Sequence, residues 1–184
     1  MYFSTSQCKE ENKNQIWART LSETYFPLSA NCHNPTEFSG TLNSWSLGML
    51  GLSEMECDGV IYHRRRSHFT NEKDSSLLIT IPHKGDVYFK QASRETKCNP
   101  GRFLVERGDT PYEFWHGKRN KLWVLKVPTA SVRARLGAIN RLGALTFDTT
   151  SGVGLYFIGA VRNTIECANQ INDVGREMAG QHLL

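Results

Sequence analysis

The stretch CNPGRFLVERGDTPYEFWH, residues 98–116, decides the fold of this chain. Two turn signals enclose a strand-like run: a Pro-Gly pair at residues 100–101 and a Gly-Asp pair at residues 108–109. Proline fixes φ at the second position of a type II turn, and glycine supplies the positive φ at the third. Pro111 cannot donate a hydrogen bond to a neighbouring strand, so we expect it where the next strand begins. The stretch therefore predicts two short β-strands bounded by tight turns.

Short strands are also expected on both sides of this stretch. The runs SLLITIP (residues 76–82), VYFKQ (residues 87–91) and KLWVLKVP (residues 121–128) are apolar or alternate polar with apolar side chains. Several short strands separated by turn residues are typical of a β-sandwich or barrel. We therefore expect a β-rich region over residues 38–128.

The N-terminal region has the periodicity of a helix. Trp17, Leu21, Tyr25 and Leu28 follow one another at intervals of four, four and three residues, which places them on one apolar stripe. Pro27 lies near the end of this run, where a helix is expected to stop.

The C-terminal region also predicts helices. A first helix is expected between Thr129 and Gly137, since threonine is a good N-cap and glycine a common C-terminal stop. The runs at residues 150–168 and 171–184 are both helical in pattern and only a few residues apart, which predicts an antiparallel pair. The second run ends on two leucines without a stop signal, so we expect this chain to be part of a longer protein.

Composition indicates a soluble globular protein. The chain has 184 residues, of which 39% are hydrophobic and 22% charged. No run approaches the ~18 apolar residues of a membrane span, and the N-terminus lacks the pattern of a secretory signal, so a cytoplasmic location is expected.

The net charge of +4 is spread along the chain, and no DNA-binding motif is visible. The five cysteines contain no CxxC pair and are expected to be reduced: Cys8, Cys32, Cys57, Cys98 and Cys167.

Taken in order, these motifs resemble the effector-binding domain of AraC/XylS-type bacterial transcription regulators. In that family a Pro-Gly turn, a short strand and an Asp-x-Pro-Tyr-like turn follow one another, as they do in residues 98–116. IWARTLSETYFPLSA (residues 16–30) is similar to the N-terminal helix of the family. SGTLNSWSLGMLGLSEMECDGVIYHRRR (residues 39–66) is similar to the strands that follow, and LWVLKVPTASVRARLG (residues 122–137) to the last barrel strand and the next helix.

The resemblance implies a mainly β fold of the α+β class. It would be a cupin-like β-barrel of the jelly-roll type with an N-terminal helix and a C-terminal antiparallel helix pair. We expect an arm and helix over residues 1–37, the barrel over residues 38–128, and linking and dimerising helices over residues 129–184. The C-terminal domain of the family, with its two helix-turn-helix units, is missing from this sequence. The resemblance therefore implies the sensing half of a regulator that is not an enzyme and contacts DNA only through another domain, with no membrane partner.

The barrel is expected to hold a small organic effector of aromatic character. Small barrels can enclose one ligand, and such pockets are mostly apolar with a few placed polar groups. Strand alternation places His63 and Arg65 on one face and Arg64 and Arg66 on the other. An inward arginine would suit a carboxylate, while core packing of the aromatics and a solvated arginine run remain open readings. The expected ligand-binding residues are Trp45, His63, Arg65, Ile79, Phe89, Phe103, Tyr112, Phe114, Trp115 and Trp123.

A homodimer is expected through the helix at residues 153–168. This run carries apolar residues on more than one face, and one face would stay exposed in a monomer, which soluble proteins tend to avoid. The expected contact residues are Leu155, Ile158, Arg162 and Ile165.

Two other functions remain open from the residues. The first is a stand-alone, metal-dependent cupin enzyme, since many cupins are metal enzymes. A cupin metal site commonly has two histidines separated by one residue, and no His-x-His occurs here, so neither metal nor another cofactor is expected. The second is a constitutive dimerisation module whose barrel is filled by side chains.

Overall fold

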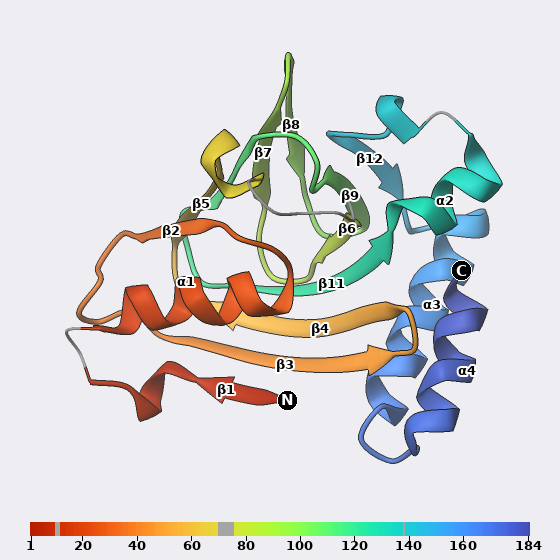
Figure 1. The fold of residues 1–184 in the computed structure, drawn as a ribbon, viewed down its shortest axis with the longest axis horizontal. Coiled ribbons are helices and arrows are strands. Elements are labelled where there is room, and N and C mark those ends of the chain that lie inside the picture. The colour runs from red at the N-terminus through yellow and green to blue at the C-terminus, as the bar shows by residue number, and fades with distance from the viewer. Residues whose placement is uncertain (10–11, 70–75, 138) are drawn as a thin grey trace.

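The computed structural model of the protein describes residues 1–9, 12–69, 76–137 and 139–184. Two antiparallel sheets face each other, with α1 along one open side and α3 and α4 at the end of the larger sheet (Figure 1). The sheets do not share a strand, so the barrel expected from the sequence is present in the cupin-like arrangement but is not closed.

The larger sheet contains seven strands and the smaller sheet five. In spatial order, the larger sheet consists of β1 (Tyr2–Ser4), β3 (Gly40–Leu47), β4 (Leu50–Cys57), β11 (Asn120–Pro128), β6 (Ser76–Pro82), β9 (Arg102–Arg107) and β12 (Leu145–Asp148). The smaller sheet consists of β2 (Ser29–Cys32), β5 (Val60–Arg64), β10 (Tyr112–His116), β7 (Val87–Gln91) and β8 (Arg94–Cys98).

The helices lie mostly outside the sheets. In chain order they are α1 (Lys13–Thr24), α2 (Thr129–Leu136), α3 (Gly152–Cys167) and α4 (Asp173–Leu183), with 3₁₀ turns at Thr5–Gln7, Arg66–Phe69 and Ile139–Arg141. Trp17 and Leu21 of α1 are fully buried, as the apolar stripe predicts. The expected antiparallel pair is confirmed: α3 packs along α4, and the hydroxyl of Tyr156 lies 3.2 Å from Nε2 of His182.

The expected turns around residues 98–116 are present. Gly101 has a φ of +91°, the left-handed value that favours glycine, and the Arg102 amide donates to the carbonyl of Asn99. The turn at Gly108 takes the chain from β9 in one sheet to β10 in the other, and Pro111 immediately precedes β10. This change of sheet places the inner faces of β9 and β10 opposite each other.

The regions outside residues 38–128 contribute strands as well as helices. Near the N-terminus, β1 pairs with β3 and β2 pairs with β5, and near the C-terminus β12 pairs with β9. The two sheets therefore extend into both flanking regions.

The larger sheet separates two apolar clusters, one on each of its faces. We call them the inner cluster, between the sheets, and the outer cluster, between the larger sheet and the C-terminal helices. In β11, Leu122 and Val124 belong to the inner cluster, whereas Trp123 and Leu125 belong to the outer one. The inner cluster includes Trp17, Leu21, Tyr25, Met55, Tyr62, Leu78, Phe89, Leu104, Tyr112 and Phe114. The outer cluster includes Leu47, Leu50, Leu52, Ile81, Val127, Ile158 and Val161.

Candidate functional site

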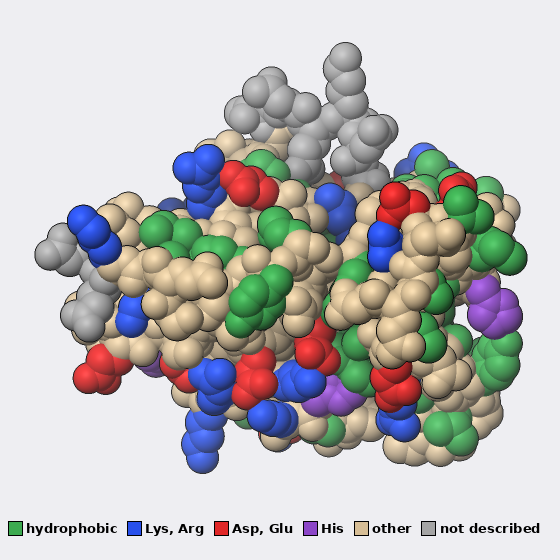
Figure 2. All heavy atoms as spheres, turned by 90° about the horizontal axis from the view of Figure 1, so that it is seen from below, with side chains coloured by type: hydrophobic (Ala, Val, Ile, Leu, Met, Phe, Trp, Pro, Cys, Tyr) green, Lys and Arg blue, Asp and Glu red, His purple; other side chains and the backbone are tan. Residues whose placement is uncertain are grey.

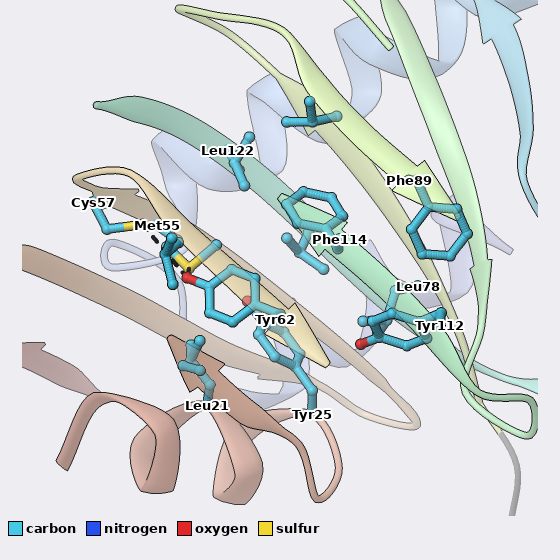
Figure 3. Packing of buried hydrophobic residues seen from close by; sticks show 14 of the residues in the cluster. Leu21, Tyr25, Met55, Cys57, Tyr62, Leu78, Phe89, Tyr112, Phe114 and Leu122 are labelled. Carbon is cyan, nitrogen blue, oxygen red and sulfur yellow. Dashed lines mark hydrogen bonds between the residues drawn. The ribbon is translucent and has the colours of Figure 1, made fainter. Parts of the chain in front are cut away.

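A cavity of about 30 Å³ lies inside the inner cluster. Figure 3 shows aromatic and aliphatic side chains from both sheets and from α1 converging on this region. Drug-sized ligands occupy pockets of roughly 300–1,000 Å³, so side chains fill most of the space between the sheets in this conformation. The lining residues are Leu21, Tyr25, Leu28, Met55, Tyr62, Leu78, Thr80, Glu106, Tyr112, Phe114, Leu122 and Val124.

Glu106 is the acidic residue of this lining. It lies on β9 next to inward-facing Leu104 and is only 3% exposed. The Thr80 hydroxyl donates to its carboxyl group, and this is the one hydrogen bond to that group from a described residue. Burial raises the pKa of Glu106 to about 8, although the Thr80 hydrogen bond acts in the opposite direction. At neutral pH the protonated form of Glu106 therefore predominates.

The same cavity carries tyrosine hydroxyl groups. The Tyr25 hydroxyl lies 2.5 Å from Oγ of Ser53, and Trp17 Nε1 donates to the Tyr62 hydroxyl across 3.0 Å. Burial raises the pKa of both tyrosines, so neither supplies a negative charge near neutral pH. The interior therefore combines an apolar, aromatic lining with a few fixed polar groups, as ligand pockets commonly do.

Three of the expected ligand-binding residues lie in this interior. Tyr112 and Phe114 line the cavity, and Phe89 packs against both of them at centroid distances of 5.2 and 6.3 Å. All three side chains point between the sheets in Figure 3.

The other expected aromatic and aliphatic residues lie elsewhere. Trp123 and, less deeply, Trp45, Ile79 and Phe103 pack in the outer cluster. Trp115 stacks on Tyr88 at 5.5 Å on the outer face of the smaller sheet. Alternation explains the difference, because one-residue neighbours on a strand point to opposite faces.

The polar anchor expected from His63 or Arg65 is also placed differently. Arg64, not its neighbours, points inward; it is 1% exposed and donates to the carbonyl groups of Pro27 and Gly108. Its guanidinium lies 4.1 Å from the ring centroid of Phe26. His63 and Arg65 border a shallow external groove of about 680 Å³, which Arg64 also reaches, and neither of them lines the interior cavity. The inward phase of β5 is set by Tyr62, which is buried in the inner cluster two residues earlier.

The expected dimerisation residues fall on different sides of α3. Leu155 is 54% exposed and Arg162 is exposed, whereas Ile158 is 8% exposed and packs in the outer cluster with Ile165 beside it. Ile158 and Ile165 therefore attach α3 to the larger sheet and are not on its free surface.

Neither a metal site nor a membrane helix is found in the part of the chain that the structure describes. No three His, Cys, Asp or Glu side chains converge there to hold a metal ion. Buried His116 instead contacts the Lys118 carbonyl at 2.7 Å and Cys57 Sγ at 3.6 Å. No helix among the described residues has the length and apolar character needed to cross a membrane.

Sequence reasoning missed the polar residues of the cavity. Glu106 lies two residues after the apolar, buried Leu104 on the same strand, so both side chains point to the same face. A carboxyl group at an inward-facing position was therefore the signal that the sequence offered. Thr80 gave no such signal, because hydroxyl residues are common in strands of either orientation.

Two comparisons place this chain among known proteins. It is 24% identical over 141 residues to the "Uncharacterized protein in nit 5'region" of Bacillus sp. (strain OxB-1), a match that covers 77% of this chain and 55% of that protein. Its fold is similar to the crystal structure of the AraC-like transcriptional activator CuxR, with a TM-score of 0.84 and 12% sequence identity. That match covers 100% of this chain and 66% of CuxR. The chain thus spans between half and two thirds of the length of these relatives.

The family assignment comes from the sequence itself. Residues 17–184 match the AraC-binding-like domain. This match extends from the buried tryptophan of α1 through both sheets to the last helix. The chain belongs to the AraC-binding-like domain family.

Proposed function

We propose that this domain binds a small organic effector between its two sheets and relays occupancy to a DNA-binding domain of the same regulator. The observation that carries the proposal is a nearly fully buried carboxyl group, Glu106, which faces an aromatic cavity and has a single hydroxyl partner among the described residues. A buried polar group without full compensation is costly to a fold, and such groups concentrate at binding sites. The proposed contacts include Phe89, Tyr112 and Phe114 from the sequence expectation, and Glu106 in addition.

Binding requires the cavity to widen, and α1 offers the means. Leu21, Tyr25 and Leu28, from α1 and the segment after it, form one wall of the cavity. Figure 3 shows Leu21 and Tyr25 facing Tyr62 from outside the sheets. A displacement of this wall would enlarge the cavity without breaking a sheet.

The strands of the larger sheet can relay that change. On β4, Met55 lines the cavity while Leu50 and Leu52 support the outer cluster under α3. On β11, Val124 lines the cavity and the next residue, Leu125, packs in the outer cluster. An effector can shift an equilibrium only if it binds the two arrangements with different affinity, and these strands contact both the cavity and the helices.

We also propose that the domain forms a homodimer through the exposed faces of α3 and α4. Figure 2 shows hydrophobic side chains gathered at the helical end of the molecule. Large apolar side chains that gather on the surface of a monomer commonly mark an interaction site. The exposed large apolar residues of these helices are Val153, Leu155, Tyr156, Val174 and Met178.

The proposal is tested by a thermal-shift screen of small aromatic amines, acids, phenols and aldehydes against the isolated domain. A compound that binds only the folded state raises the melting temperature by mass action. We expect at least one class to stabilise the domain, and to alter transcription in a reporter strain that carries the full-length regulator. A library without stabilising compounds, together with unchanged reporter activity, would favour a constitutive dimerisation module.

A further inference from the structure

We propose that the effector carries a protonated amine that binds Glu106 between the sheets. The inference rests on the proposed effector site and names the chemistry that this site would recognise.

The lining of the cavity favours a cation. Among the described lining residues, Glu106 is the one carboxyl group, and none is lysine, arginine or histidine. The carboxyl accepts a hydrogen bond from Thr80 and from no other described residue, so it retains acceptor capacity for an ammonium group. An effector with a carboxylate would instead place a second acid beside Glu106, where like charges disfavour ionisation.

The aromatic rings add a second attraction. Tyr25, Tyr62, Tyr112 and Phe114 line the same cavity as Glu106. Aromatic faces attract ammonium groups, and the attraction strengthens where water is excluded. Arg64, the buried cation of this end of the molecule, lies against Phe26 and donates to backbone carbonyls instead of lining the cavity.

Proton balance gives the proposal a measurable signature. Unliganded Glu106 holds a proton up to a pH of about 8, and pairing with an ammonium group favours the ionised form. Below that pH, each ammonium bound must therefore release one proton from Glu106 to solvent. The other ionisable groups around the carboxyl are Tyr25, Tyr62 and Tyr112 of the lining and Cys98, which is electrostatically coupled to Glu106. Burial raises the pKa of Tyr25, Tyr62 and Cys98, so they remain neutral between pH 6 and 8.

The test is isothermal titration of the domain with benzylamine, benzyl alcohol and benzoate, three probes of similar shape that differ in charge. We expect benzylamine to bind most tightly at pH 8 and its affinity to fall about tenfold per pH unit below that. Titrations at pH 6.5 in buffers of different ionisation enthalpy should show the release of about one proton per benzylamine. Benzyl alcohol binding should not change between pH 6 and 7.

The matched variants are Glu106→Gln and Glu113→Gln. Glu113 lies on β10 between Tyr112 and Phe114 but points outward, with its side chain 43% exposed. Glu106→Gln should lower the affinity for benzylamine at pH 8 at least tenfold and remove the pH dependence of that affinity. Glu113→Gln should change neither the affinity nor its pH dependence. The proposal that the effector carries an amine would be overturned by either of two results. The first is the same benzylamine affinity in the Glu106→Gln protein as in the unmodified domain, and the second is pH-independent benzylamine binding to the unmodified domain. If Glu106→Gln does not fold, the pH profile and proton count of the unmodified domain decide.

These outcomes separate the two proposals. If benzoate or benzyl alcohol binds in the interior more tightly than benzylamine, the amine inference fails while the effector site stands. If no probe binds and the wider screen is also negative, both fail.

Discussion

The two faces of the larger sheet differ in what they bury. The outer face buries mainly apolar clusters beneath α2, α3 and α4, with a few polar contacts at Trp123, which donates to Glu54 and packs against the His83 ring at a centroid distance of 3.8 Å. The inner face buries a carboxyl group and several hydroxyl groups around a small cavity. Well-packed apolar side chains would stabilise the fold at less cost than these polar groups. The difference supports the proposal that an effector binds at the inner face, whereas the outer face attaches the helices.

The largest expected effect is the pH dependence of stability caused by Glu106. Its pKa in the folded domain is about 8, against 4.5 ordinarily. The folded state thus binds the proton more tightly than the unfolded chain between these values, and stability is lost as pH rises through that window. Each pKa unit corresponds to about 1.4 kcal/mol, so the loss reaches about 5 kcal/mol. Because glutamine does not ionise, the Glu106→Gln protein should not show this loss of stability.

Chemical denaturation of both proteins at pH 5 and pH 8.5 measures this difference. The free energy of unfolding of Glu106→Gln, relative to the unmodified domain, should increase markedly between the two pH values, whereas Glu113→Gln should not show this increase. A constant difference between Glu106→Gln and the unmodified domain would mean that Glu106 is not held neutral.

The next effect compares two leucines on one strand. Leu122 and Leu125 of β11 are each 1% exposed but belong to the inner and the outer cluster, respectively. Replacing either with alanine should cost about 2–5 kcal/mol of stability. Only Leu122→Ala enlarges the effector cavity, so it alone should change the ligand preference toward bulkier compounds. A comparable change in Leu125→Ala would remove the functional distinction between the faces.

A smaller effect on stability, with a large effect on assembly, is expected at Leu155. Because its side chain is largely exposed on α3, Leu155→Asp should change the stability of the monomer by no more than about 0.5 kcal/mol. It should nevertheless convert the proposed dimer to a monomer in light scattering. Lys90→Asp, an exposed substitution on β7, is the control that should remain dimeric. A monomeric unmodified domain at high concentration would refute the dimer.

The smallest expected effect is spectroscopic. Trp17 donates to Tyr62, whose ring lines the cavity, while Trp115 stacks with Tyr88 outside. An effector should therefore alter the fluorescence of Trp17, and Trp17→Phe should abolish most of the change. Trp115→Phe should retain it; loss of the signal in that variant would instead point to the outer face of the smaller sheet.

The sequence predicted the fold better than the site. Turn chemistry at Gly101 and Pro111, and the apolar stripe of Trp17 and Leu21, are local signals, and the structure confirms them. The site depends on which phase of each strand faces inward. Burial of Tyr62 sets that phase for β5 and turns Arg64 inward, which the alternation of residues 63–66 alone could not determine. The hydrogen bond between Tyr25, at the end of α1, and Ser53 of β4 could not be predicted from the spacing of these residues in the sequence.

The most direct test of the account is a methyl NMR titration of the domain with the compound that stabilises it most in the screen. Met55, Leu122 and Val124 report on the inner face, and Leu125 and Val127, on the same strand as two of them, report on the outer face. An effector bound between the sheets should give ligand-to-methyl nuclear Overhauser effects for the inner three residues and none for the outer two. Contacts confined to Leu125 and Val127, or to residues of the external groove at Arg65, would contradict an effector site between the sheets.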